Sequence, residues 1–149
     1  MCQVRKHFLT SVLALICFIF TSCNRVKQIN NVPLMFKGTF CKTDIYTEDK
    51  LSISISDNEI NGTLVSSIYG NRQNSHRVIS IYEKCENWIE IICKDNDSTY
   101  TSFNKYILSI KNDNIYFEFA EMINSIKDES ELNNAEWYYK DIGYMNRCD

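Results

Sequence analysis

The chain has 149 residues, with 16 Lys and Arg against 19 Asp and Glu, and a formal charge of −3. This length suits one domain with a real core rather than two. An acidic balance offers no basic face for phosphate groups, so we expect no nucleic-acid partner. Only four Gly occur in the whole chain, which leaves little material for a phosphate-binding glycine loop.

The first 22 residues have the anatomy of an export signal. A basic cluster at residues 5–7 precedes a mostly apolar run from Phe8 to Phe20, which closes on Thr21 and Ser22. The run is shorter than the roughly 20 residues that a membrane-spanning helix needs. We therefore expect residues 1–22 to be a signal peptide that is removed.

The end of this segment, Phe20-Thr21-Ser22-Cys23, resembles the lipobox of bacterial lipoproteins. Phe20 stands where Leu is commonest in that family, and Ser22 where Gly or Ala is commonest. The resemblance implies cleavage before Cys23 and acylation of its thiol and new amino group by palmitate-like chains. The mature protein would then be anchored in a bacterial envelope membrane, such as the outer membrane, facing the periplasm. Plain secretion and an uncleaved anchor are the alternatives.

The remainder of the chain is more acidic than the whole. Arg5 and Lys6 leave with the signal peptide, so 14 basic residues face 19 acidic ones, and 14 − 19 gives −5. Residues 24–31 are polar and lack periodicity, which is typical of a tether. We predict a lipidated Cys and tether over residues 23–33, and a single β-rich domain over residues 34–149.

Period-two patterns predict the strands. Leu51, Ile53 and Ile55 alternate with serines, and after an Asp57-Asn58 turn the alternation resumes over residues 60–68, which predicts a hairpin. A first strand is expected over residues 36–41, where Gly38 marks a bulge or a close approach. Residues 69–75 are predicted to be a polar loop and residues 84–87 a turn. Further strands are expected over residues 78–82, 88–94, 100–111 and 115–119.

The strand pattern changes after Phe119. Apolar residues at Phe119, Met122, Ile123 and Ile126 follow a helical spacing, which predicts a short helix over residues 120–127. Residues 130–140 fit either further helical turns or a closing strand. We predict an all-β fold, a small antiparallel barrel or sandwich of about seven or eight strands with a short C-terminal helix. The alternative is an α+β fold in which a helix covers one face of an antiparallel sheet.

One short segment adds a resemblance to a barrel family. Gly38-Thr39-Phe40 is faintly similar to the Gly-x-Trp opening of lipocalin-like barrels, with Phe40 in place of Trp. That resemblance implies a barrel that carries a small apolar ligand.

Four cysteines remain beyond the leader and Cys23. Cys41, Cys85, Cys93 and Cys148 form an even set, which suits two disulfides in an oxidising compartment. If residues 84–87 are a hairpin turn, Cys93 lies about 17 Å along the returning strand from the partner of Cys85. A disulfide requires about 5.5 Å between Cα atoms. A Cys85–Cys93 bond is therefore disfavoured, and the other pairings stay open.

The sequence offers little material for catalysis. His76 is the only His after the leader, and its neighbours Ser75 and Ser80 do not make a triad by adjacency. We interpret His76 as a half-exposed residue at a strand end, and we predict no catalytic residues, no cofactor and no enzyme activity. No C-x-x-C pair occurs, so we predict no metal site among the thiols.

These observations favour an interaction protein. Small periplasmic inhibitors and toxin-immunity lipoproteins are similar in size, acidity and disulfides. We therefore predict an inhibitor or immunity protein that binds a basic partner, such as a hydrolase or a toxin. Tyr69, Trp137 and Tyr138 are the predicted binding anchors. The alternative is a lipocalin-like carrier; a cavity lined by Ile, Phe and Tyr would favour it, and a filled core would favour the interaction protein.

Overall fold

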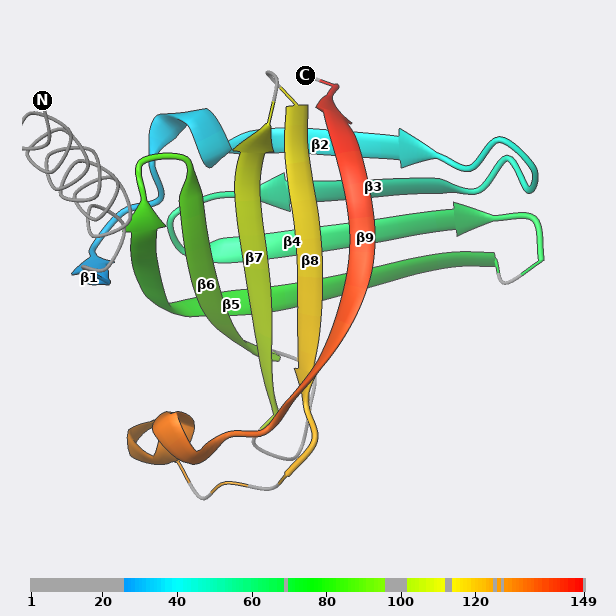
Figure 1. The fold of residues 1–149 in the computed structure, drawn as a ribbon. Coiled ribbons are helices and arrows are strands. Elements are labelled where there is room, and N and C mark those ends of the chain that lie inside the picture. Colours follow the sequence, from blue (N-terminus) through cyan, green and yellow to red (C-terminus); the bar gives the residue numbers. More distant parts are fainter. Residues whose placement is uncertain are drawn as a thin grey trace, which may run out of the picture.

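The computed structural model describes residues 26–68, 70–95, 102–111, 114–124, 126 and 128–148. Nine antiparallel strands make one sheet in the order β1-β5-β4-β3-β2-β9-β8-β7-β6, and a further β5–β6 pairing closes eight of them into a barrel (Figure 1). The predicted all-β barrel is thereby confirmed. The strands are β1 (Lys27–Ile29), β2 (Gly38–Thr43), β3 (Lys50–Ile55), β4 (Glu59–Ser66), β5 (Gly70–Cys85), β6 (Trp88–Asp95), β7 (Phe103–Lys111), β8 (Asn114–Met122) and β9 (Trp137–Arg147).

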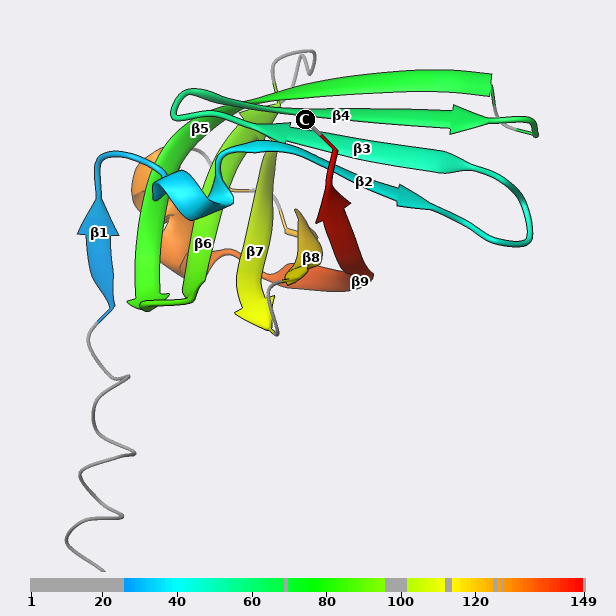
Figure 2. The ribbon, with the colours of Figure 1, turned by 90° about the horizontal axis from the view of Figure 1, so that it is seen from above.

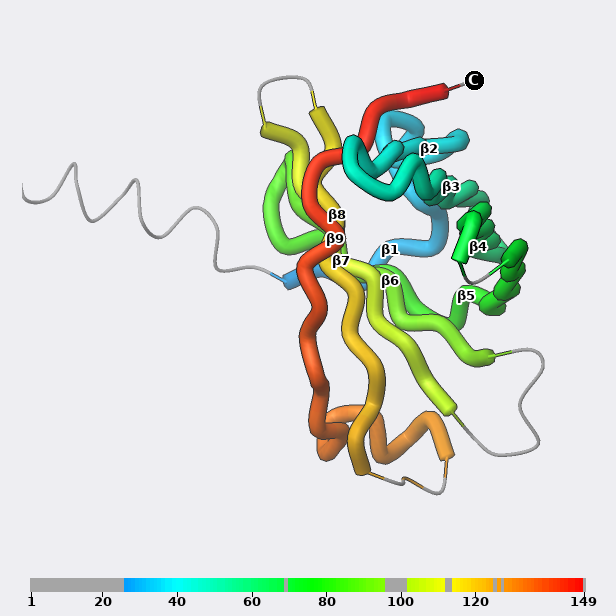
Figure 3. Tube along the Cα trace, turned by 90° about the vertical axis from the view of Figure 1, so that its right-hand side faces the viewer, coloured from blue at the N-terminus to red at the C-terminus, as the bar shows by residue number. Residues whose placement is uncertain are grey.

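The long strand β5 joins the two halves of the barrel. Its first half pairs with β4 and its second half with β6, and the register shifts between Val78 and Ser80 where the strand bends. As a result β2–β5 run across β6–β9 at a steep angle, and two hairpins project on one side (Figures 1 and 2). The end-on view shows the two halves facing each other across the interior (Figure 3).

The seam between β2 and β9 is short and covalently reinforced. Only two residue pairs join these strands, Phe40 with Arg147 and Cys41 with Asn146. The disulfide Cys41–Cys148 lies beside them, with 5.8 Å between the Cα atoms. The disulfide between Cys41 and Cys148 is one of the pairings that the sequence left open. It joins the barrel covalently at the seam with the fewest residue pairs.

Alternation places one face of every barrel strand inside. The interior is filled by large apolar side chains, of which Phe36, Phe40, Ile60, Ile89, Ile91, Leu108 and Phe117 are at most 1% exposed. Gly38 has a φ of 119°, a conformation that favours glycine, and it pairs with Ile55 at the start of β2. The special backbone expected at Gly38 is therefore present.

The predicted helix over residues 120–127 is wrong. Ala120 and Met122 belong to β8, whose ladder with β9 continues to the pair Met122–Trp137. The 3-10 turn η2 (Glu129–Asn134) covers the outer face of the sheet at this end, in a second apolar cluster that includes Ile92, Phe103, Ile126, Leu132 and Trp137. Because both faces of β8 are covered here, its apolar residues lose strict alternation and imitate a helical spacing.

The closing strand that the sequence left open is β9. The predicted polar loop over residues 69–75 is also wrong, since β5 begins at Gly70 and pairs with β4 along the projecting hairpin. Its side chains are polar because this hairpin extends beyond the core into solvent. The turn at residues 84–87 is confirmed, with Cys85 opposite Trp88.

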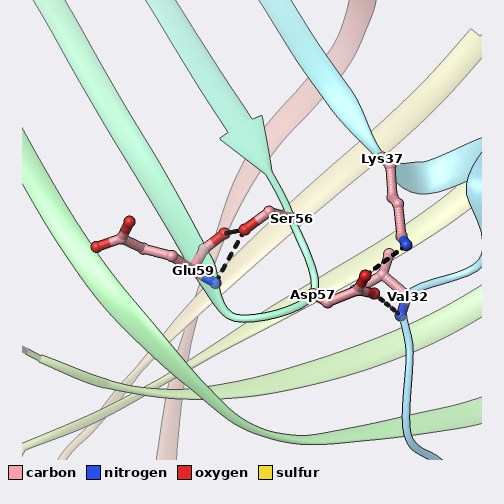
Figure 4. A network of polar contacts seen from close by, with 5 residues as sticks. All are labelled: Val32, Lys37, Ser56, Asp57 and Glu59. Carbon is pink, nitrogen blue, oxygen red and sulfur yellow. Dashed lines mark hydrogen bonds and ion pairs between the residues drawn. The ribbon is translucent and has the colours of Figure 1, made fainter.

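The N-terminal segment is part of the folded domain from its first described residues. Strand β1 pairs with β5, and Val32 is 2% exposed, so this part of the predicted tether packs on the barrel. Asp57 holds the segment in place: it accepts hydrogen bonds from the backbone N–H of Val32 at 2.8 Å and from Lys37 Nζ at 2.6 Å (Figure 4). The 3-10 turn η1 (Leu34–Phe36) follows and inserts Phe36 into the core.

Candidate functional site

A row of aromatic side chains crosses the outer face of β6–β9. Trp88 pairs with Ser109, Ser109 with Tyr116, and Tyr116 with Tyr144, so these four residues lie side by side on one face. Their neighbours Ile89, Leu108 and Phe117 are buried inside the barrel, which places the row outside. Trp88 is 41% exposed and Tyr144 is 52% exposed. We call Trp88, Tyr116 and Tyr144 the aromatic row.

The aromatic row is rigid because the sheet fixes its backbone. The rings of Tyr116 and Tyr144 meet edge to face, with 5.0 Å between their centroids. Neighbouring strands lie about 4.8 Å apart, so the row from Trp88 to Tyr144 spans roughly 15 Å. Between Trp88 and Tyr116 the surface has a shallow hollow of about 300 Å³, which Ile107 and Glu118 also line.

Carboxylates form the next row of the same face. Glu90 pairs with Ile107, Ile107 with Glu118, and Glu118 with Asp141. Glu90 forms an ion pair with Lys84 at 3.2 Å. A hydrogen bond to Asp141 raises the pKa of Tyr116 to about 12, because the phenol proton is held against the carboxylate. The face therefore combines aromatic rings with negative charge.

Two lysines add positive charge to the same face and partly offset the carboxylates. Lys111 Nζ lies 4.9 Å from the centroid of the Tyr116 ring at one end of the hollow. Lys105 Nζ lies 4.4 Å from the Trp137 ring at the other end of the face, and burial lowers its pKa. Glu118 lines the hollow with Trp88 and Tyr116, and Asp141 accepts the hydrogen bond from Tyr116.

The predicted anchors do not come together. Trp137 packs in the second apolar cluster beside η2, so it is a structural residue. Tyr138 is 57% exposed, but it is adjacent to Trp137 in β9 and so points to the other face of the sheet from the aromatic row. Tyr69 lies outside the described residues. Sequence reasoning missed Trp88 and Tyr116, although the alternation of Tyr116 with Ile115 and Phe117 was a signal that Tyr116 faces outward.

A second hollow lies on the inner side of the projecting hairpins. It has a volume of about 300 Å³ and is mostly apolar, with Leu51, Ile53, Leu64, Phe119 and Ile142 among the lining residues. Arg72 and Asn74 supply polar groups at the same site. Gly62 also lines it, and a Cβ added there would meet no atom within 4 Å. We call this hollow the inner groove.

His76 lies deeper than the sequence suggested. It is 5% exposed rather than half-exposed. Its Nδ1 lies 2.8 Å from the hydroxyl of Tyr106, and its Nε2 lies 3.4 Å from the Asn104 amide nitrogen. Burial raises the pKa of Tyr106 well above the ordinary tyrosine value, so this hydroxyl stays protonated. The cluster is a buried polar network at the edge of the inner groove.

The cysteines differ from the predicted two bridges. Cys41 and Cys148 are bonded to each other, while Cys93 carries a free thiol that is fully buried. The prediction that Cys93 is oxidised is therefore wrong, because its side chain points into the apolar core. Burial raises the pKa of this thiol far above its usual range. The expectation that Cys85 and Cys93 do not bond to each other is confirmed.

Comparison with protein-family models, curated proteins and solved structures found no match for this chain. Within the described residues, no group of three or more His, Cys, Asp or Glu side chains is placed to hold a metal ion. Across the same part of the chain, no helix has the length and apolarity needed to cross a membrane. Cys23 and the signal segment lie outside the described residues.

Proposed function

We propose that this protein is a non-catalytic interaction protein that binds a basic partner through the aromatic row and the carboxylates beside it. The observation that carries this proposal is the pairing of two rows on one rigid face: Trp88, Tyr116 and Tyr144 next to Glu118 and Asp141. Trp and Tyr are the commonest energetic anchors of protein interfaces. A partner's Lys or Arg can lie against the rings while its charge meets the carboxylates.

The filled interior also favours this class of function. Side chains that are at most 1% exposed occupy the centre of the barrel and pack there as one apolar cluster. The −5 charge of the chain after residue 22 steers a cationic partner toward it and raises the association rate. Inhibition or immunity toward a basic hydrolase or toxin is the biological role that we propose for such binding.

Carriage of a small apolar ligand is the second candidate, and the inner groove is the observation that favours it. The groove offers aliphatic and aromatic walls with Arg72 and Asn74 as polar groups. Its volume of about 300 Å³ lies at the lower end of the range for ligand pockets. Residues from both halves of the barrel line the groove, from β3–β5 on one side and from β7–β9 on the other.

The test is binding to a defined set of basic proteins, including a lysozyme, measured by surface plasmon resonance at several salt concentrations. We expect at least one to bind, with an association rate that falls as salt rises, because screening shortens the field to about 8 Å at physiological ionic strength. Trp88→Ala and Tyr144→Ala should each weaken that binding by roughly 30-fold or more, corresponding to about 2 kcal/mol.

Tyr46→Ala is the matched control, because Tyr46 is 95% exposed on a projecting hairpin away from the aromatic row. Equal losses for Tyr46→Ala and Tyr144→Ala would contradict the assigned surface. Failure of every basic protein to bind, together with a small apolar molecule retained by the purified protein, would favour the carrier.

A further inference from the structure

Strand β9 has an unpaired edge over much of its length. It pairs with β8 from Trp137 to Met145, but with β2 only at Asn146 and Arg147. Beyond this seam β2 runs away from β9 at a steep angle (Figure 1). Backbone N–H and C=O groups of a strand point alternately to its two sides, so alternate groups of residues 138–142 point away from β8. Among the described residues no second strand pairs with them, and we call residues 138–142 the open edge.

The open edge is accessible from both faces of the sheet. Tyr138 is 57% exposed and Tyr139 is 52% exposed, and Lys140 and Asp141 are exposed as well. Successive residues of a strand point to opposite faces, so neither face of this stretch is covered. An unpaired and uncovered strand edge is a template for the addition of another strand.

Lys42 marks the place where the open edge ends. Its Nζ donates a hydrogen bond to the Ile142 carbonyl at 2.7 Å, so this carbonyl points toward β2 and away from β8. A Cβ on Gly143 would lie 3.2 Å from the same nitrogen, so the glycine leaves room for the lysine. A charged side chain thus occupies the ladder position next to the seam, and residues 138–141 are left for an added strand.

We propose that the basic partner adds an extended segment to the open edge as an antiparallel strand, in which basic side chains alternate with apolar ones. This inference rests on the proposed function, since the same partner binds the aromatic row. On the outer face an added strand lies beside Asp141, which pairs with Glu118, so this face suits Lys or Arg. On the inner face Ile142 lines the inner groove with Leu51 and Phe119, so this face suits an apolar side chain.

A second copy of β9 fits the open edge less well. A two-fold antiparallel pair places residues of the same face opposite each other. The registers with β8 put Trp137, Tyr139 and Asp141 on the outer face, and none of these is basic. A second copy therefore offers no cation to Asp141, whereas a basic partner does.

The experiment uses a defined peptide, Lys-Val-Lys-Leu-Lys-Val, capped at both ends. Its binding to the protein is followed by fluorescence anisotropy, and the amides that it protects are located by hydrogen exchange with mass spectrometry. We expect exchange of residues 138–142 to slow by roughly tenfold or more at saturation, because their outward N–H groups become hydrogen-bonded to the peptide. Exchange in β6, which is not adjacent to β9, should stay unchanged.

Two control peptides separate strand addition from simple charge attraction. Val-Val-Leu-Lys-Lys-Lys has the same composition without the alternation, and a version of the first peptide with N-methylated backbone amides keeps its side chains but donates no backbone hydrogen bond. Both should lose binding. Asp141→Asn should weaken the alternating peptide by roughly fivefold, while Glu48→Gln, which removes the same charge from an exposed residue of the hairpin between β2 and β3, should not.

Several outcomes would overturn the inference: no binding of the alternating peptide up to about 1 mM, equal binding of either control peptide, or a peptide-free dimer already protected at residues 138–142. The proposed function fails separately. If a basic protein binds and Tyr144→Ala weakens it while residues 138–142 exchange as in the free protein, the aromatic row stands and strand addition is wrong. If the peptide protects the open edge but Trp88→Ala and Tyr144→Ala do not affect the binding of basic proteins, strand addition stands and the aromatic row is not the binding surface.

Discussion

The hydroxyl of Tyr106 lies 2.8 Å from Nδ1 of His76 inside the barrel wall. Strands β5 and β7 bring the two residues together from 30 positions apart in the chain. The Phe119 ring stacks on the imidazole, with 6.4 Å between centroids, and completes the buried cluster. His76, the only His after the predicted leader, is therefore a buried residue whose ring nitrogens contact protein groups rather than solvent.

Tyr106→Phe should destabilise the protein by about 1–3 kcal/mol, because it removes the hydroxyl that His76 Nδ1 contacts inside the barrel. Urea unfolding followed by tryptophan fluorescence measures this loss. Tyr138→Phe is the control, since Tyr138 is 57% exposed and its loss of a hydroxyl should change little. An unchanged unfolding midpoint for Tyr106→Phe would show that this contact contributes nothing to stability.

Separation of Cys41 from Cys148 should weaken the seam between β2 and β9. The bridge closes a loop with a sequence separation of 107, and the seam has only two other residue pairs. We expect the Cys41→Ser, Cys148→Ser double variant to lose about 2–4 kcal/mol of unfolding free energy. The rate of hydrogen exchange should rise first at the backbone N–H of residue 148, which in the wild-type protein donates to the Thr39 carbonyl. Uniform exchange across all strands would instead indicate that the barrel opens as one unit.

Acid should release the N-terminal segment. A hydrogen bond from Lys37 lowers the pKa of Asp57, desolvation opposes this shift, and the hydrogen bond from the Val32 N–H adds to it. A carboxyl with a lowered pKa contributes stability above its unfolded pKa of about 3.9, and this contribution is lost as pH falls through the folded value. The protection of the Val32 amide against hydrogen exchange, relative to the intrinsic rate at each pH, should therefore fall below about pH 4. Asp57→Asn should show fast exchange already at neutral pH, and slow exchange in that variant would contradict the role assigned to the charge.

Alkaline titration should detect the hydrogen bond between Tyr116 and Asp141. Its pKa of about 12 reflects the hydrogen bond to Asp141, which favours the neutral phenol. The stability that this interaction gives is present below the unfolded pKa of about 10 and is lost as pH rises through about 12. Asp141→Asn should lower the pKa of Tyr116 toward 10, as measured by ultraviolet absorbance. Ser109→Ala, in the same row, should leave it unchanged.

A larger residue at position 62 should fill the inner groove without strain. A Cβ there meets no atom within 4 Å, and the backbone of Gly62 is not in the left-handed region. If the groove binds an apolar molecule, Gly62→Leu should weaken the affinity for an apolar probe such as 1-anilinonaphthalene-8-sulfonate by at least tenfold. The affinity is measured by titration, followed by the rise in probe fluorescence. Gly62→Ala should have a smaller effect, and both variants should unfold at the wild-type midpoint or above it. Unchanged probe binding in Gly62→Leu would locate the probe elsewhere.

The strands themselves were largely predictable from the sequence. Serines alternating with Leu51, Ile53 and Ile55 predicted β3, and the Asp57-Asn58 turn predicted its hairpin with β4. This succeeded because a strand with one wet face and one dry face has a period of two, and the period survives in the sequence alone. The turn at residues 84–87 also excluded the Cys85–Cys93 bond by simple distance along the strands.

Two segments were predicted wrongly because contacts with residues distant in the sequence determine their structure. Residues 120–127 imitate a helix because η2 covers the outer face of β8, and that cover comes from a segment later in the chain. The sequence predicted a loop over residues 70–75 because their side chains are polar, as suits a hairpin that projects beyond the core. All of these residues nevertheless pair with β4. In both cases the neighbours that decide the structure are remote in sequence, and no local period records them.

The candidate surface has the same origin. Trp88, Tyr116 and Tyr144 are spread over nearly sixty positions of the sequence, and only the registers of β6–β9 align them in one row beside Glu118 and Asp141. The sequence by itself determined an acidic, β-rich chain with an export-like leader and cysteines suited to oxidation. Strand pairing then determined which aromatics share a face and which thiols can meet, because both depend on distances between residues that the chain brings together only by closing the barrel.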